Sequence, residues 1–234
     1  MQALMNRNGA IISTVAAGFL LGSRTIITAT GASTYTTPVG CRCIIVELIG
    51  GGGGGKTTAN STAGQIIIAG GGAGGQYARS SPNVTSGGVR FNVTVGAGGI
   101  AGGAGGPCSF TTSFGYNFVN ANGGPAGTNA IASGTAEAFI VPVSGGAAVP
   151  ISWQNSNGNP SIAAHRVSGT VAINGRGACG PHGGSPVGHK AQVATATAGG
   201  NYGGGGDGGI SVNAGGASTG GAGGQGICIV WEFY

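Results

Sequence analysis

The chain alternates between short apolar runs and blocks of glycine that follow them directly. Residues 89–95 (VRFNVTV) carry apolar side chains at every second position, which is the period of a strand with one buried face. Similar runs lead into glycine blocks at 44–55, 66–75, 91–106 and 210–226. The pattern predicts short β-strands that each continue into a glycine segment.

Other segments have the composition of strands and turns. Residues 24–38 are rich in Thr, Ile and Tyr and predict a strand, a turn and a second strand. Residues 76–79, 139–143 and 151–153 are shorter strand candidates, and the run at 226–234 ends the chain. No stretch shows the period of an amphipathic helix. We therefore expect a mostly β and irregular fold with essentially no helix, except near the N-terminus.

The amount of glycine changes what the strands can pack against. Glycine supplies 56 of the 234 residues, yet 40% of the chain is hydrophobic and 6% is charged, the reverse of the signature of disorder. The blocks lack a strict Gly-X-Y period, which excludes collagen. Polyglycine can form the extended helix of polyproline II while keeping N–H groups that bond neighbouring helices. We expect packed polyglycine II-type segments, with the varied spacers as loops at the ends.

Two regions depart from this pattern. Residues 10–22 (AIISTVAAGFLLG) are apolar and follow Arg7, as in a signal peptide, but they are too short for a membrane-spanning helix. We interpret residues 1–23 as an apolar docking arm for a neighbouring subunit, and residues 24–234 as one glycine-rich β/polyglycine domain. Residues 128–198 have scattered glycine and varied composition, and we expect a variable insert there.

The charge and the cysteine content limit the kinds of binding partner and of cross-link that we expect. Nine Lys and Arg against four acids give a net charge of +5, but the basic residues are scattered and form no stripe. A solvated surface is therefore favoured over nucleic-acid binding. The five cysteines are an odd number, which leaves one thiol over if the others pair. We favour buried free thiols, as in a protein made in a reducing cytoplasm, with disulfides between chains as the alternative. These cysteines are Cys41, Cys43, Cys108, Cys179 and Cys228.

One motif resembles a phosphate-binding loop. Gly50 to Gly55 with Lys56 and Thr57 matches the P-loop spacing directly after an apolar run. A P-loop also needs a helix to follow and an acidic partner for Mg²⁺. The next residues do not open a helix, and none of the four acids ends a hydrophobic strand in the required way. We interpret the match as a consequence of six consecutive glycines.

Metal and catalytic chemistry have weaker signals. Cys179 and His182 have the spacing of a ligand pair, with His189 and His165 as further donors, but structural zinc uses two closely spaced pairs. Acid–base catalysis needs positioned carboxylates, and the chain has four acids and no hydrolase nucleophile motif. We expect loop residues rather than a metal site, no cofactor and no enzymatic activity.

Aromatic and basic residues of the varied region are the candidates for contact with a partner. Tyr, Trp and Arg are frequent anchors at interfaces, and aromatic rings also stack on sugars. For Trp153, core and contact roles stay open, whereas the phenylalanines at 110–118 are interpreted as core. The receptor-binding candidates are Trp153, His165, Arg166, His182, His189 and Tyr202.

Six segments follow one another in a characteristic order: TYTTPVG (34–40), IIVELIGGGGGG (44–55), GGAGGQYA (71–78), FNVTVGAGG (91–99), the Ser-Phe pairs at 109–110 and 113–114, and GGAGGQGICIVWEFY (220–234). Their order resembles the glycine-rich domain of phage tail-fibre proteins and is similar to the fibre-tip adhesins of T-even-like phages. The resemblance covers roughly residues 34–110 and 199–234. It implies a sandwich of polyglycine II helices and receptor binding through the loops between glycine motifs.

The resemblance implies a phage virion component, extracellular after release, that contributes to host attachment. The expected partners are other virion proteins, bound through residues 1–23, and a host-surface glycan or outer-membrane protein. We also expect a homo-oligomer, or docking on an oligomeric shaft. Two alternatives stay open: a purely structural virion protein without receptor binding, and a secreted glycine-rich wall or matrix protein.

Overall fold

The fold is all β wherever the structure describes the chain. The computed structural model describes residues 4–5, 11–13, 21–134, 137–147, 153–168, 171–182 and 196–234. The predicted fold class is confirmed there, and none of these residues lies in a helix that could cross a membrane. Most of the predicted docking arm, with any helix near the N-terminus, lies outside the described residues. Those that are described form β1 (Leu4–Met5), β2 (Ile11–Ser13) and the start of β3 (Leu21–Ile27).

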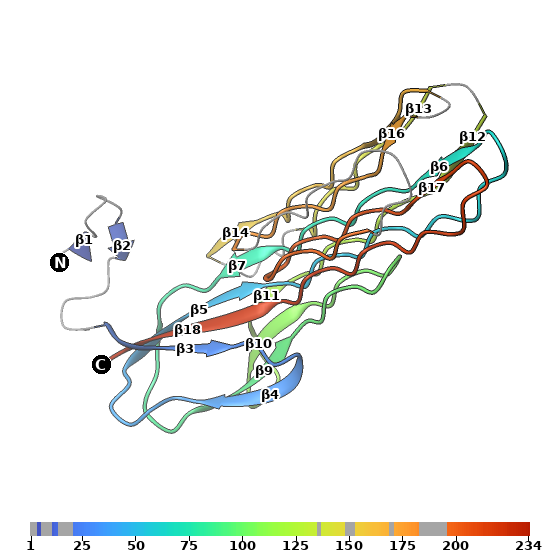
Figure 1. Ribbon diagram of the computed structural model, residues 1–234. Coiled ribbons are helices and arrows are strands. Elements are labelled where there is room, and N and C mark those ends of the chain that lie inside the picture. Colours follow the sequence, from blue (N-terminus) through green and yellow to red (C-terminus); the bar gives the residue numbers. More distant parts are fainter. Residues whose placement is uncertain are drawn as a thin grey trace.

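Two antiparallel sheets pack face to face at one end of the molecule (Figure 1). The first contains β3, β5 (Cys43–Ile49), β7 (Tyr77–Arg79), β8 (Asn83–Val84), β14 (Gln154–Ser156) and β18 (Ile227–Phe233). The second contains β4 (Gly31–Thr36), β9 (Arg90–Val95), β10 (Cys108–Thr112) and β11 (Asn117–Ala121). The strand orders are β14–β7–β5–β18–β3, with β8 also paired to β5, and β11–β10–β9–β4. The first and last long strands of the described chain, β3 and β18, therefore lie side by side.

The alternating side chains of these strands form the main core between the two sheets. Phe91 on β9 and Phe110 on β10 contact each other with ring centroids 4.8 Å apart, and Phe118 packs against both. Phe114 and Tyr116 instead lie at the turn of the β10–β11 hairpin and are exposed. The core interpretation of the cluster at 110–118 is thus confirmed for Phe110 and Phe118 and wrong for Phe114. Phe114 lies in the turn between the two strands and therefore outside the sheet.

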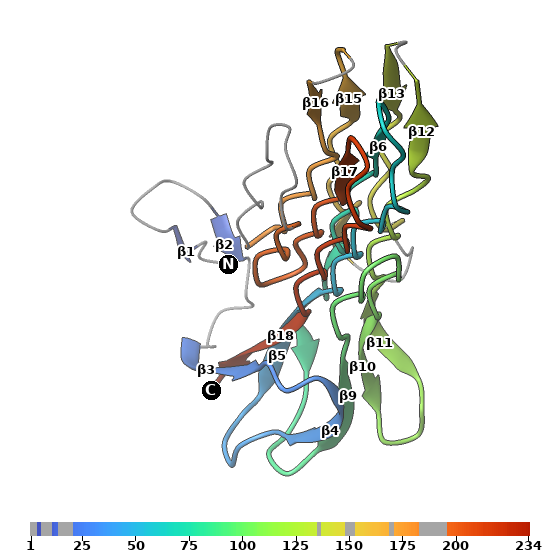
Figure 2. The same ribbon diagram turned by 45° about the vertical axis from the view of Figure 1, so that its right-hand side comes forward.

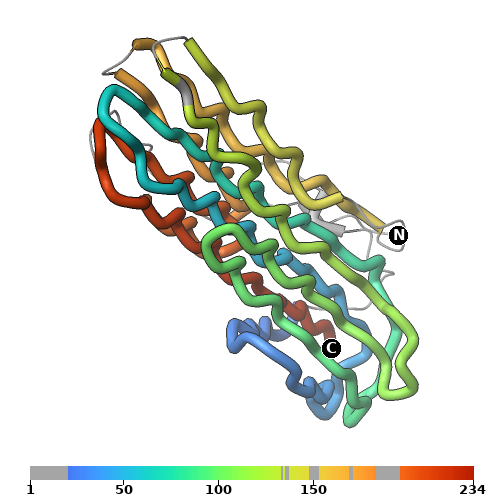
Figure 3. Tube along the Cα trace, turned by 90° about the vertical axis from the view of Figure 1, so that its right-hand side faces the viewer, coloured from blue at the N-terminus to red at the C-terminus, as the bar shows by residue number. Residues whose placement is uncertain are grey.

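A bundle of glycine-rich segments extends from the sandwich, and Figure 3 shows them as parallel traces running along the molecule. The segment 50–56 continues β5 directly into this bundle. The N–H groups of residues 50, 53 and 56 donate to the segment 70–76, those of 51 and 54 to 103–106, and those of 52 and 55 to 221–224. Successive N–H groups therefore point to three different neighbours, and every third one returns to the same neighbour. This is the threefold repeat of polyglycine II.

The carbonyl groups of the same segment bind a further set of neighbours. Gly51 and Gly54 accept from the segment 124–127, Gly52 and Gly55 from 99–102, and residues 53 and 56 from 206–209. Within the described residues, segment 50–56 thus lies at the centre of six others. A Cβ on any of the six glycines from Gly50 to Gly55 would lie 1.9–2.1 Å from a backbone carbonyl oxygen. Only glycine fits at this centre.

Small sheets close the opposite end of the bundle (Figure 2). One has the order β12–β6–β17 and the other β13–β15–β16. Ile66, Ile140 and Ile210 are buried between these two sheets. The varied segments between glycine blocks therefore meet far from the sandwich. The strands are β6 (Ile66–Ile68), β12 (Ile131–Ser133), β13 (Ala138–Ile140), β15 (Ala164–Arg166), β16 (Ala172–Ile173) and β17 (Ile210–Val212).

A buried carboxylate joins β3 to the rest of the sandwich. Glu232 on β18 is 1% exposed and accepts hydrogen bonds from Thr25 Oγ1 at 2.7 Å and Tyr35 OH at 2.8 Å. Ser23 and Tyr234 donate to the same carboxylate. Burial raises the pKa of Glu232, but the four hydroxyl donors favour the ionised form and together lower its pKa below the ordinary value. The carboxylate therefore contributes stability as an anion.

We predict that Gly53→Ala disrupts the bundle. Its new methyl group would lie 1.9 Å from the Pro125 carbonyl oxygen, and a backbone lattice has no flexible side chain that can move aside. The expected loss is about 3 kcal/mol in the free energy of unfolding, at the upper end of overpacking effects. Thermal and denaturant unfolding, followed by circular dichroism, measures the change.

Gly216→Ala is the matched control. No atom lies within 4 Å of the position that its Cβ would take, and its φ is not in the left-handed region. We expect this variant to be neutral or stabilised by about 0.5 kcal/mol, because alanine restricts the unfolded chain. Equal losses in both variants would contradict the close packing of the central segment.

Acidification should weaken the sandwich through Glu232. The pKa of Glu232 is lower in the folded chain than in the unfolded chain, where it is about 4.3. The carboxylate therefore contributes its full stabilisation above about pH 4.3, and this contribution is lost as the pH falls through the folded-state pKa. Glu232→Gln leaves some hydroxyl donors without an acceptor and should cost about 2 kcal/mol at neutral pH. Its stability should also change less than that of the natural chain between pH 5 and pH 2. Glu137→Gln, an exposed carboxylate, serves as the control.

Candidate functional site

The far tip carries a row of outward-facing side chains across three strands, of which Phe139 is exposed and His165 and Ile173 are half-buried. In the sheet β13–β15–β16, Phe139 pairs with His165, and His165 pairs with Ile173. Directly paired residues place their side chains on the same face of a sheet. The neighbours Ile140, Ala164 and Ala172 are buried on the opposite face. We call the row Phe139–His165–Ile173 the tip row.

The described surroundings of the tip row combine apolar side chains with a histidine–carboxylate pair. Phe139 is 65% exposed, and Val141, Val167 and Val171, which lie next to the strands of the same sheet, are also exposed. His165 Nε2 lies 2.8 Å from Glu137 Oε1, which holds the imidazole against its neighbouring strand. The described part of the tip thus presents an aromatic and aliphatic surface together with the hydrogen-bonding pair His165–Glu137.

Arg166 does not belong to this surface. Its side chain is 0% exposed, and its Nε donates to the Ser168 carbonyl oxygen at 3.0 Å. The period-2 alternation of β15 explains the difference, because neighbours on a strand point to opposite faces. His165 is therefore directed outward and Arg166 inward, and Arg166 is not available to a receptor in this structure.

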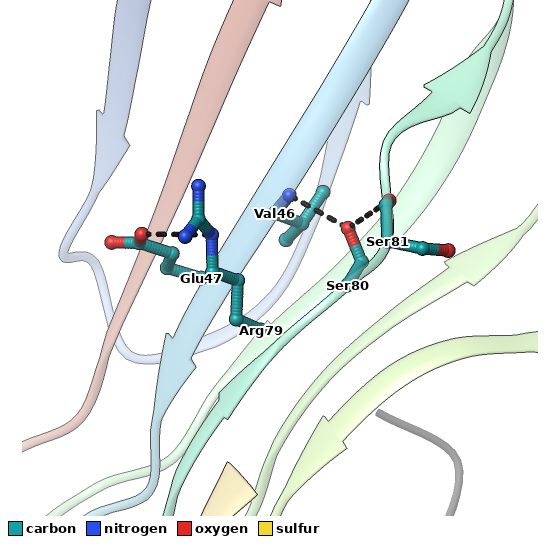
Figure 4. Close-up of polar contacts among 5 residues, drawn as sticks. All are labelled: Val46, Glu47, Arg79, Ser80 and Ser81. Carbon is teal, nitrogen blue, oxygen red and sulfur yellow. Dashed lines mark hydrogen bonds and ion pairs between the residues drawn. The ribbon is translucent and has the colours of Figure 1, made fainter. Parts of the chain in front are cut away.

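A second group of candidates lies where the bundle meets the sandwich. Trp153 precedes the edge strand β14, is 62% exposed, and lies over the guanidinium of Arg79, with Cζ 5.8 Å from the ring centroid. Arg79 Nε in turn lies 3.3 Å from Glu47 Oε1 (Figure 4). Beside this pair, Ser80 Oγ accepts from the Val46 N–H at 2.9 Å and fixes the path of the chain after β7. Trp153 is therefore a surface residue and not part of the core.

Two further candidates lie close to the same strand. His182 is exposed, and its ring makes an edge-on contact with Tyr77 of β7, with centroids 6.4 Å apart. Tyr202 is half-buried, and its carbonyl oxygen lies 2.0 Å from where a Cβ on Gly180 would be. Tyr202 therefore lies beside the segment that leads to His182. The structure brings Trp153, His182 and Tyr202 to the β7 end of the bundle and places His165 at the tip. His189 lies outside the described residues.

The P-loop-like segment has no free phosphate cradle. The N–H groups of Gly50 to Lys56 all donate to carbonyl groups of neighbouring segments at 2.8–2.9 Å. A phosphate would have to displace these bonds, which hold the centre of the bundle. The interpretation of this motif as a consequence of consecutive glycines is consistent with that geometry.

The cysteines divide into two kinds. Cys41, Cys43, Cys108 and Cys228 are buried free thiols, as predicted, whereas Cys179 is an exposed free thiol. Burial raises the pKa of the Cys108 thiol to about 11 and also raises that of Cys228. Among the described residues, no three His, Cys, Asp or Glu side chains gather into a group that could hold a metal ion.

The sequence alone did not indicate several residues of both groups. Glu47, Tyr77 and Arg79 belong to ordinary strand runs, and their pairing with Trp153 depends on β14 joining β7 across more than 70 residues. Phe139 was predicted within a strand, but its exposure depends on which face of β13 covers the bundle. The pairing register of the strands determines that face, and no local sequence motif indicates the register.

Comparison with known proteins places the whole assembly in one family. No curated protein matches the chain. A family model described as a glycine-rich domain matches residues 27–231, from the end of β3 into β18, and so includes the sandwich strands, the bundle and the tip. Because this match covers far more than half of the sequence, the chain belongs to the glycine-rich domain family.

Proposed function

We propose that this chain is a structural component of a phage particle, in a tail fibre or spike, that contributes to host attachment through the segments between its glycine motifs. The observation that carries the proposal is the outward-facing tip row, with exposed Phe139 and exposed valines next to its strands, at the end of the bundle remote from the sandwich. The resemblance of the motif order to tail-fibre domains supports the same assignment. The proposal contains no catalytic step.

The two ends of the molecule suit different tasks. The sandwich end contains β3 and the C-terminal strand β18, so the chain segment that precedes β3 enters there. This is where attachment to other virion proteins through residues 1–23 would begin. The tip lies at the other end, where contact with a host is sterically unhindered by such a mounting (Figure 1).

The tip has the composition of a contact surface. Phe139, Val141, Val167 and Val171 are each about half exposed or more, and all four lie on or next to the strands of the sheet β13–β15–β16. Exposed apolar residues that gather on one part of a protein surface mark interaction sites. The aromatic ring supplies an anchor, and the His165–Glu137 pair supplies polar specificity.

The bundle also gives the tip rigidity. Its segments are joined by lateral backbone hydrogen bonds at every turn, so the tip sheets start from fixed positions. A pre-organised surface loses less conformational entropy on binding than a flexible loop. A purely structural virion role would use the same bundle, but it gives no reason for the outward-facing tip row.

The proposal predicts that purified chain adsorbs to susceptible bacteria and that Phe139→Ser weakens this adsorption at least about tenfold, as expected for a hot-spot residue. Fluorescently labelled protein is measured on a panel of Gram-negative and Gram-positive strains by flow cytometry. Strains that bind are then used for concentration series with each variant.

Phe114→Ser is the matched control, because Phe114 is 88% exposed but lies at the sandwich end. It should adsorb like the natural chain. Absence of adsorption to every strain, or an equal loss in both variants, would contradict attachment through the tip. Melting temperatures of both variants show whether the fold is retained.

A further inference from the structure

A single exposed tryptophan lies beside the edge strand of the larger sheet. Trp153 is 62% exposed although large aromatic side chains are usually well buried. The guanidinium of Arg79 lies 5.8 Å from its ring centroid and orients the ring by a cation–π contact. Much of the ring therefore stays open to solvent while its position is restrained.

A row of planar polar groups lies beside this ring. Glu47 on β5 pairs in register with Arg79 on β7, and Arg79 pairs with Gln154 on β14. Ala78 and Leu48, the neighbours of this row, are buried in the main core, so the row lies on the opposite face of the sheet, where Gln154 is exposed and the side chains of Arg79 and Glu47 are 20% and 15% exposed. A carboxylate, a guanidinium and an amide are thus aligned across three strands, next to an aromatic plane. We call Glu47, Arg79, Trp153 and Gln154 the β7 cluster.

The next row extends the cluster toward the bundle. Tyr77 is half-buried on the same face as Arg79, two residues away, and its ring contacts His182. Burial first, then the nearby charge of Glu47 and a hydrogen bond to its carboxylate, raise the pKa of Tyr77 to about 12, so the phenol stays protonated and donates to Glu47. The cluster therefore contains both donors and acceptors within a small area.

This chemistry matches a sugar ring. A pyranose has an apolar face of C–H groups that packs on an aromatic plane, and a rim of hydroxyl groups that bind planar side chains in pairs. The charges of Arg79 and Glu47 balance each other at 3.3 Å. A neutralised arginine favours a neutral hydroxylated ligand over a phosphate or another anion.

We propose that the β7 cluster is a saccharide-binding subsite for a neutral hexose unit of a cell-surface glycan, with Trp153 as the stacking platform, the exposed Gln154 as hydroxyl partner, and Glu47 holding Arg79 in place beneath the ring. The inference rests on the proposed function only for the source of the glycan. It concerns a surface at the opposite end of the bundle from the tip row, so the two can be tested separately.

The test applies the full-length chain to an array of bacterial surface oligosaccharides and follows each retained glycan by NMR with ¹⁵N-labelled protein. The chain has two tryptophans, so two indole N–H signals are expected. Binding should shift the signal of Trp153 and leave that of Trp231 unchanged. Trp153→Ala should weaken binding at least tenfold, and Trp153→Phe should retain part of it, because a smaller ring still stacks.

Phe139→Ser, at the tip, should bind the retained glycan as the natural chain does. No retained glycan, a shift confined to Trp231, or unchanged binding by Trp153→Ala would overturn the subsite. Failure of the tip to mediate adsorption shows instead as loss of cell binding without loss of glycan binding. An unchanged melting temperature of Trp153→Ala confirms that the lost contact, and not the fold, is responsible.

Discussion

The lateral hydrogen bonds of segment 50–56 are the interaction on which the rest of the structure depends. Each N–H and most carbonyl groups of this segment join it to six surrounding segments, and every one of its glycines would clash with a carbonyl oxygen if it carried a Cβ. Backbone groups thus replace side chains as the means of close packing. Glycine loses much conformational entropy on ordering, and the satisfied backbone groups offset that loss.

The lateral backbone hydrogen bonds hold the middle of the bundle together, and a buried hydrophobic cluster packs at each of its two ends. The sandwich core around Phe91 and Phe110 lies at one end, and the cluster around Ile66, Ile140 and Ile210 lies at the other. The strands β5, β6 and β9 continue into glycine segments without a turn, whereas β17 first turns at Asn213 and Ala214. Side-chain burial at the two ends therefore fixes the register of the strands, and the glycine segments that continue from these strands have the same register.

The order of apolar runs and glycine blocks is a local property, so it could be predicted. The strands over 43–49, 90–95 and 227–233 follow from alternation or apolar runs, and the polyglycine II segments follow from the blocks. Which segments surround residues 50–56 could not be predicted, because identical glycines carry no register. The positions of Arg166 and Phe114 also escaped prediction, since one depends on the face of β15 and the other on the turn of a hairpin.

The same backbone lattice explains why the candidate binding side chains lie at the ends of the bundle. At the centre of the bundle, positions 50–55 have no room for a Cβ, whereas the buried side chain of Asp207 in a surrounding segment accepts from the backbone N–H of Gly177. Groups of large side chains instead lie where segments leave the bundle: the tip strands at one end and the β7 edge at the other. The tip can therefore vary in sequence without altering any hydrogen bond of segment 50–56. A scaffold held by its backbone separates the specificity of its surface from the stability of its interior.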